Sequence, residues 1–132
     1  MKRYTTYLAL LLIIISSFSV SCAQEDTTVT NITVDQLKKE MVSDTSLIVL
    51  DVRRPDELTG PLGKIDKVVN IPVEELGKRI AELDKYKSHK IAAICRSGRR
   101  SLKATKILMQ NGFNVENVEG GMEAYHKSLG GQ

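Results

Sequence analysis

Two short apolar runs constrain the fold more than any other feature of this sequence. Residues 47–50 (LIVL) and 91–94 (IAAI) are apolar at every position, and each lies between segments with a helical pattern. A strand that is apolar throughout is typical of a parallel sheet covered by helices on both faces. We therefore expect an α/β fold with an open, largely parallel sheet flanked by helices. Its ligand site should lie at the carboxyl ends of the strands.

The other expected elements follow from helix caps and chain breakers. Thr33 begins a capping-box pattern, which predicts a helix that ends near residue 42. Further strands are expected at 68–71 and 115–118, and further helices at 75–83, 100–110 and 122–129. In the helix at 100–110, the apolar side chains of Leu102, Ile107 and Leu108 are expected to face the sheet.

Cys95 lies where the second apolar run ends and a helix begins. Backbone N–H groups in such a turn, together with the positive end of the helix dipole, bind anions and lower the pKa of a thiol. Because the thiolate is the nucleophile, we predict that Cys95 is catalytic and that the following loop binds the substrate. The predicted loop residues are Arg96, Ser97, Gly98, Arg99 and Arg100. The alternatives are an inert buried cysteine and a solvated run of arginines.

The three loop arginines are expected to deepen the positive potential around the thiol. Arg96 and Arg99 are predicted to contact the anion at the rim, and Arg100 to brace the loop from inside. Asp51 and Arg53 also follow an apolar run, but an Asp-x-Arg pair there is better explained as a tie for the following loop. No cluster of metal ligands, phosphate-binding glycine motif or nicotinamide fingerprint is visible, so neither a cofactor nor a metal is expected.

The segment CRSGRRS (95–101) resembles the active-site loop of the rhodanese (thiosulfate sulfurtransferase) superfamily. Four further segments are similar to the family's motifs and follow in its order: ITVDQL (32–37), VLDVR (49–53), VNIP (69–72) and GGMEAY (120–125). The sequence departs from the family at 63–67, where Gly-His-Ile-Pro-Gly is common, and at Tyr125, where tryptophan is usual. The resemblance implies a rhodanese-like fold and a sulfurtransferase that works through a Cys95 persulfide. The donor would be thiosulfate or a persulfide, and the acceptor a thiol, cyanide or a protein cysteine.

Two other functional classes remain open. A cysteine phosphatase or arsenate reductase would carry its arginine six positions after the cysteine, where this chain has Ser101. The shorter loop closes a smaller cradle, which favours sulfur transfer. The second class is a non-enzymatic sulfur carrier or an anion-sensing binding module. Rapid turnover with thiosulfate and cyanide would favour the enzyme over the carrier.

The N-terminus has the pattern of a secretory signal. Lys2 and Arg3 precede an apolar stretch that is shorter than the roughly twenty residues needed to span a bilayer. We expect a signal peptide over residues 1–21, a polar tether over 22–31 and the rhodanese-like domain over 32–129. Cys22 follows a lipobox-like segment, which predicts lipidation and a periplasmic location in the bacterial cell envelope. Cleavage after Ala23 would instead discard Cys22, and either route would leave Cys95 as the only free thiol.

Charge argues against nucleic acid as a partner. The full chain has a formal net charge of +3, but without residues 1–21 it holds 17 basic and 16 acidic residues. The full chain has only six aromatic residues, four Tyr and two Phe, and no extended basic stripe is evident along the sequence. The expected partners are therefore a small sulfur-containing anion and a thiol acceptor, with the membrane reached only through a lipid anchor.

Overall fold

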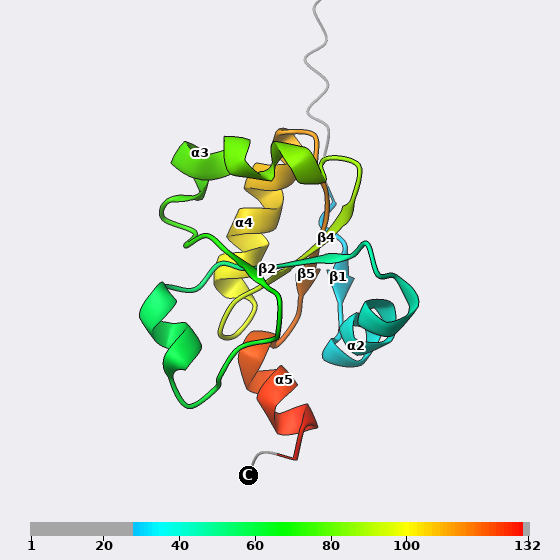
Figure 1. Cartoon of the computed structure of the whole chain (residues 1–132), viewed down its shortest axis with the longest axis vertical. Helices are drawn as coiled ribbons and strands as arrows, with labels where there is room; N and C mark the ends of the chain where they lie inside the picture. The colour runs from blue at the N-terminus through cyan, green and yellow to red at the C-terminus, as the bar shows by residue number, and fades with distance from the viewer. Residues whose placement is uncertain (1–27, 131–132) are drawn as a thin grey trace, which may run out of the picture.

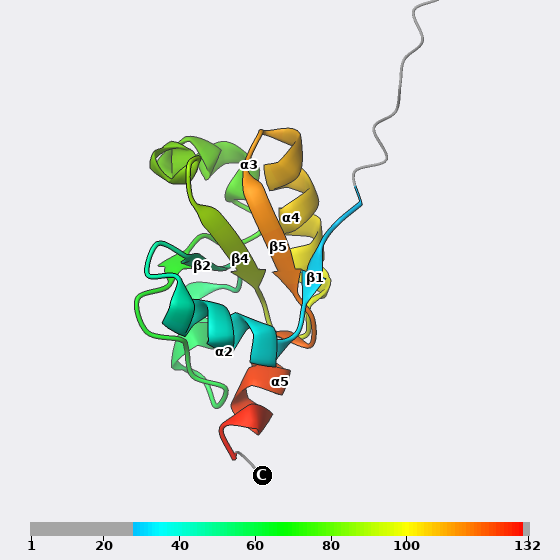
Figure 2. The same cartoon turned by 90° about the vertical axis from the view of Figure 1, so that its right-hand side faces the viewer.

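A parallel sheet of five strands forms the centre of the computed structural model, which describes residues 28–130. The strands are β1 (Asn31–Ile32), β2 (Ile48–Asp51), β3 (Val69–Asn70), β4 (Lys90–Ile94) and β5 (Asn114–Val118). Their order is β1-β5-β4-β2-β3, and every neighbouring pair is parallel. Figure 2 shows β5 between β1 and β4. The expected open, parallel α/β sheet is confirmed.

Helices cover both faces of this sheet. The helices are α2 (Val34–Ser43), α3 (Leu76–Arg79), α4 (Arg99–Gln110) and α5 (Gly121–Ser128). One core joins α3 and α4 to the sheet through Leu76 and Leu108, and the other joins α2 and α5 through Leu37 and Met122. Because β2 and β4 bury side chains in both cores, they are apolar at nearly every position. Figure 1 shows α3 and α5 at opposite ends of the molecule.

The start of α2 follows the capping box expected from the sequence. The Thr33 hydroxyl accepts a hydrogen bond from the N–H of Gln36 at 3.2 Å. In return, the N–H of Thr33 donates to the side-chain carbonyl of Gln36 at 2.8 Å. These two bonds satisfy donors that a helix start otherwise leaves free, so the local sequence sets this boundary.

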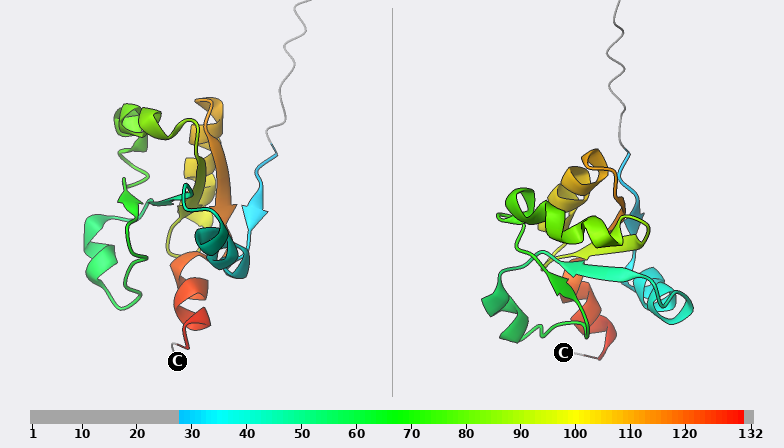
Figure 3. Two further views of the ribbon diagram at one scale, coloured as in Figure 1. Left: turned by 45° about the vertical axis from the view of Figure 1, so that its right-hand side comes forward. Right: turned by 45° about the horizontal axis from the view of Figure 1, so that its top comes forward.

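Two segments differ from the expected helices. The helix expected at 75–83 is a single turn, α3, followed by the 3-10 helix η3 (Ile80–Tyr86). Gly77 lies inside α3, where the freedom of glycine disfavours a longer α-helix. The segment that follows β2, where no helix was expected, contains the 3-10 helix η2 (Pro55–Thr59). Figure 3 shows η2 and α5 at the end of the sheet toward which β5 runs.

The buried face of α4 also differs from the expectation. The fully buried residues are Ser101, Ala104, Thr105 and Leu108. Ile107 is half-buried against the core, as expected, but Leu102 belongs to neither core cluster. The expectation for Leu102 was wrong because an apolar residue at helical spacing does not by itself show which arc of the helix faces the sheet.

The predicted polar tether ends earlier than expected. Asn31, its last predicted residue, forms β1 and pairs with Asn117 of β5, and the N–H of Asn117 donates to the carbonyl of Thr30. The predicted signal peptide, Cys22 and the tether up to residue 27 lie outside the described residues. Within residues 28–130, none of the helices has the length and apolar character needed to cross a membrane.

Candidate active site

Cys95 lies directly after β4, at the carboxyl edge of the sheet, and the turn to α4 follows it. Gly98 caps α4 with a φ of 96°, a left-handed conformation that favours glycine. A Cβ atom at this position would come within 3.3 Å of the Val118 carbonyl oxygen and the Gly120 nitrogen. The positive φ and the close approach of Val118 and Gly120 therefore both favour glycine at this position.

The Cys95 sulfur is buried and accepts hydrogen bonds from the turn that follows it. The N–H of Gly98 lies 3.2 Å from Sγ, and the hydroxyl of Ser101 lies 3.4 Å from it. Burial of the thiol raises its pKa. The Ser101 hydroxyl and the backbone N–H groups of Ser101, Gly98 and Ser97 lower the pKa by more, so the net shift is downward. The turn therefore stabilises the thiolate form of Cys95 relative to that of an ordinary cysteine.

The three loop arginines have different contacts and do not form one positive patch. Arg96 is 65% exposed, and its Nε donates to Glu123 at 2.7 Å. Arg100 donates to both carboxylate oxygens of Glu57 in η2, at 2.7 and 2.6 Å. Arg99 is exposed and pairs with no carboxylate within residues 28–130. The positive potential around the loop is therefore weaker than expected, because glutamates offset two of the three charges.

The Arg100–Glu57 pair anchors the loop from the side of η2. Donation by Arg100, assisted by the N–H of Arg54, outweighs burial and lowers the pKa of Glu57 from 4.5 to about 2. Both charged side chains are more than two-thirds buried, so the bidentate pair is well shielded from water. Arg100 therefore makes the inward bracing contact that was expected of it.

Helix α5 holds the same loop from the opposite side. The N–H of Met122 donates to the carbonyl of Cys95 at 2.8 Å, and that of Glu123 donates to the carbonyl of Arg96 at 3.0 Å. Gly121, with a φ of 55°, lies so close that a Cβ atom would overlap both of these carbonyl oxygens. The Gly-Gly segment at 120–121 thus lets the first turn of α5 bind the loop backbone.

The buried pair of Asp51 and Arg53 has the structural role that the sequence suggested. Nη2 of Arg53 donates to Asp51 at 2.7 Å and to the carbonyl of Gly63 at 2.8 Å. Nη1 donates to the carbonyl of Glu57 at 3.2 Å. The guanidinium therefore ties together the two ends of the segment from Glu57 to Gly63, which forms one wall of the site.

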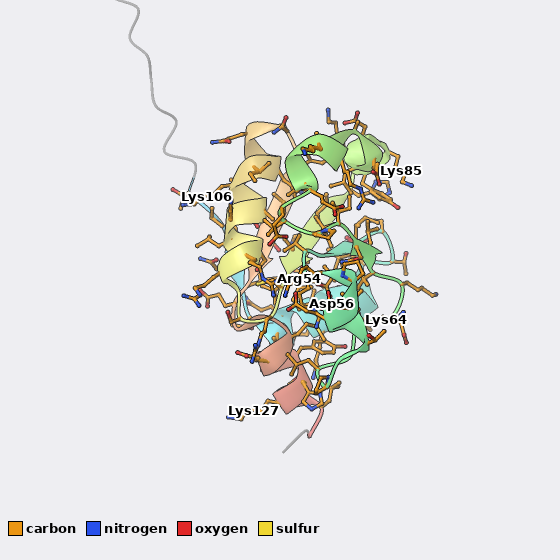
Figure 4. All side chains as sticks on the ribbon, turned by 90° about the vertical axis from the view of Figure 1, so that its left-hand side faces the viewer. Arg54, Asp56, Lys64, Lys85, Lys106 and Lys127 are labelled. Carbon is orange, nitrogen blue, oxygen red and sulfur yellow. The ribbon has the colours of Figure 1, made fainter. Side chains whose placement is uncertain are left out.

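A cavity of about 390 Å³ adjoins this wall. It is lined by Arg53, Glu57, Gly60, Pro61, Leu62 and Arg96. Arg96 connects the cavity to the cysteine loop, but the Cys95 sulfur does not line it. Figure 4 shows Arg54 and Asp56 on the η2 segment at this side of the molecule. The space beside the loop is thus large enough for a ligand bigger than a single sulfur atom.

Three residues of the site were missed from the sequence: Ser101, Glu57 and Glu123. Ser101 had a visible signal, since a hydroxyl in the first turn of a helix can point back to the preceding loop. The two glutamates lie 43 and 27 residues away from their arginine partners, and nothing local marks them. Residues 28–130 contain no cluster of three or more metal-ligating side chains, and His89 and His126 are half-buried surface residues.

The fold and the site define an α/β domain with a cysteine loop at a strand-to-helix turn. The family model for the rhodanese-like domain matches residues 33–128, and the chain belongs to this family. It is 38% identical over 89 residues to YtwF of Bacillus subtilis, covering 67% of this chain and 82% of YtwF. It is 30% identical over 98 residues to the sulfurtransferase of Allochromatium vinosum, covering 74% of this chain and 88% of that protein.

A solved structure agrees with this assignment. The rhodanese-related protein from Thermoplasma volcanium superposes with a TM-score of 0.67 at 34% identity, covering 75% of this chain and 92% of that protein. The chain is therefore a sulfurtransferase-like domain. Membership in the family implies a sulfur donor and a thiol acceptor in general terms.

Proposed function

We propose that this protein is a sulfurtransferase in which the Cys95 thiolate takes a sulfane sulfur from thiosulfate or a persulfide. The observation that carries the proposal is the set of donors around Sγ. The Gly98 N–H and the Ser101 hydroxyl both point at the buried sulfur, and the pKa of Cys95 is lowered. These donors would stabilise the thiolate and then the persulfide, which also carries its negative charge on sulfur.

The proposed reaction has two balanced steps. In the first, the Cys95 thiolate attacks the outer sulfur of thiosulfate. A new S–S bond forms, the S–S bond of thiosulfate breaks, and sulfite leaves with the electron pair. In the second, an acceptor thiolate attacks the outer sulfur of the Cys95 persulfide, and Cys95 leaves as the thiolate. Neither step needs a metal ion, a redox cofactor or a separate general base.

The loop residues take distinct parts in this proposal. Ser97 and Gly98 contribute backbone N–H groups, and Gly98 also provides the turn. Arg99, which is exposed and unpaired within the described part of the chain, is the loop cation best placed to attract an anionic donor. Arg96 borders the cavity and Arg100 holds the loop. The small cradle supports a sulfane sulfur as the transferred group.

Intact-mass measurement of the protein incubated with thiosulfate tests this function. The expected result is the mass of one added sulfur, which disappears on addition of cyanide together with the formation of thiocyanate. Cys95→Ser should retain the fold, since the change is small, and should acquire no sulfur because the hydroxyl is a poor nucleophile at neutral pH. Transfer by Cys95→Ser at the wild-type rate would refute the assignment of Cys95.

We also propose that the protein is exported to the cell envelope and attached there through a lipid on Cys22. The support is the N-terminal pattern of basic residues, an apolar stretch and small residues before Cys22. The polar residues that follow would separate the anchor from the domain. The reaction would then take place in the periplasm, beside the membrane.

A further inference from the structure

The outer face of α4 carries a row of basic side chains that begins at the cysteine loop. Arg99, Lys103 and Lys106 are exposed and recur at helical spacing, so they lie on one side of the helix. None of them pairs with a carboxylate within residues 28–130, and α4 contains no acidic residue. Figure 4 shows Lys106 at the opposite edge of the view from Lys64 and Lys85. The folded helix thus creates a basic stripe that was not recognised along the sequence.

This charge pattern is unfavourable for the isolated helix. Arg99 lies in the first turn, where a cation opposes the helix dipole, and Arg99 and Lys103 are like charges four residues apart. A row of unpaired cations that opposes local stability is therefore better explained by an anionic partner than by folding.

The surroundings of the stripe favour a protein as that partner. Leu102 and Met109 lie along one border of the stripe and are only half-buried, and Leu102 packs in neither core. From Arg99 to Lys106 the row extends about 10 Å, a rise of about 1.5 Å per residue. A short basic row next to an apolar contact matches a protein interface more closely than the long track of phosphates in a nucleic acid.

We propose that the outer face of α4, formed by Arg99, Leu102, Lys103 and Lys106, is the docking surface for an acidic protein whose cysteine accepts the sulfur. The inference rests on the proposed transfer through Cys95 and identifies the class of acceptor. Because the stripe starts at the loop, a partner bound along it brings its thiol to the Cys95 persulfide. The acceptor thiolate bonds to the outer sulfur, the Cys95–sulfur bond breaks, and Cys95 keeps the electron pair as the thiolate.

The test uses the full-length protein loaded with sulfur and three acceptors. Two are cysteine peptides flanked by glutamates or by lysines, and the third is the small neutral thiol 2-mercaptoethanol. We expect the acidic peptide to react on the order of tenfold faster than the basic peptide at low ionic strength, with the difference lost at high salt. The variant Lys103→Glu/Lys106→Glu should reverse this preference while its rate with 2-mercaptoethanol stays unchanged.

A matched control separates the stripe from total charge. Lys39→Glu/Lys78→Glu changes the net charge by the same amount at two exposed lysines on α2 and α3 that make no ion pair within residues 28–130, and it should keep the wild-type preference. Equal rates with both peptides, or the same effect from both double variants, would overturn the docking surface. The docking surface would also be overturned if Lys103→Glu/Lys106→Glu lost binding to phosphatidylglycerol vesicles while its rates with the two peptides stayed unchanged, because the stripe would then bind a membrane. If the wild-type protein transferred sulfur neither to the peptides nor to 2-mercaptoethanol, the result would instead refute sulfur transfer through Cys95.

Discussion

Replacing Ser101 by alanine tests the origin of the lowered pKa of Cys95. The Ser101 side chain is fully buried, and its hydroxyl lies 3.4 Å from Sγ and 3.1 Å from the Gly98 carbonyl oxygen. One hydroxyl proton serves both acceptors, so removing it costs the thiolate less than a dedicated charged hydrogen bond would. We assign the hydroxyl a contribution of about 1.4 kcal/mol to the stability of the thiolate, near the lower end for hydrogen bonds to charged groups. This free energy equals about one pKa unit.

The expected pKa of Cys95 in Ser101→Ala is therefore about one unit above that of the wild type. Below both pKa values the thiolate population falls about tenfold, whereas the reactivity of each thiolate rises about threefold because nucleophilicity increases with pKa. The alkylation rate of the variant should thus be about threefold lower at low pH and about threefold higher at high pH. Alkylation rates with iodoacetamide, measured over a pH series for both proteins, test the lower rate at low pH and the higher rate at high pH.

Thr105→Val is the matched control for Ser101→Ala. Thr105 lies one turn further along the same buried face of α4, and its hydroxyl makes no hydrogen bond within the described part of the chain. Its replacement by a methyl group should leave the alkylation profile unchanged. An unshifted profile for Ser101→Ala, or an equal shift for Thr105→Val, would show that the Ser101 hydroxyl does not stabilise the thiolate.

Three further predictions concern the supports of the loop and the anchor. Glu57→Gln should lower the free energy of unfolding at neutral pH by about 1–2 kcal/mol, because it breaks the bidentate pair with Arg100. The folded state lowers the pKa of Glu57 from 4.5 to about 2, so urea unfolding should show a more stable wild type above pH 4.5 and a loss of this difference as pH falls toward 2. A difference in the free energy of unfolding that persists in full at pH 2 would contradict the stabilising role of the Glu57 carboxylate. Gly121→Ala should lower the free energy of unfolding by about 2–4 kcal/mol in thermal unfolding, because of the positive φ and the overlap of the new Cβ with the loop carbonyls. Gly77→Ala, whose Cβ meets nothing within 4 Å, should be neutral or stabilising. Equal effects of the two changes would contradict the close contact between α5 and the loop carbonyls. Cys22→Ala should lose lipid labelling and membrane association but keep sulfur transfer, and a variant that stays in the membrane fraction would rule out this anchor.

The parts of the fold that could be predicted depend on local signals. The apolar runs at 47–50 and 91–94 mark β2 and β4 because strands covered on both faces leave few positions for polar side chains. The capping box at Thr33 is equally local. The absence of Leu102 from both cores could not be predicted, because the rotation of α4 about its axis depends on the turn at Gly98 and on the contact with β5.

The candidate site divides in the same way. Cys95 could be found because its place between a strand and a helix follows from the adjacent sequence. The pairing of Arg100 with Glu57 and of Arg96 with Glu123 could not, since it depends on how η2 and α5 pack against the loop. The sequence shows no partners for these arginines and so indicated a strong positive potential. In the folded chain, Glu57 and Glu123 offset the charges of Arg100 and Arg96.

These pairings separate two tasks that the sequence assigned to the same residues. The hydroxyl and N–H donors that lower the pKa of Cys95 belong to the turn itself. Helix η2 holds this turn in place through the ion pair with Arg100, and α5 does so through hydrogen bonds to the carbonyls of Cys95 and Arg96. In our proposal, Arg99 and the basic stripe that continues from it attract the incoming anion. In our proposal, changes at Ser101 therefore alter the reactivity of the sulfur, whereas charge changes along α4 alter the rate of encounter with the partner. Because salt screens exposed charges far more than buried hydrogen bonds, ionic strength should affect only the second property.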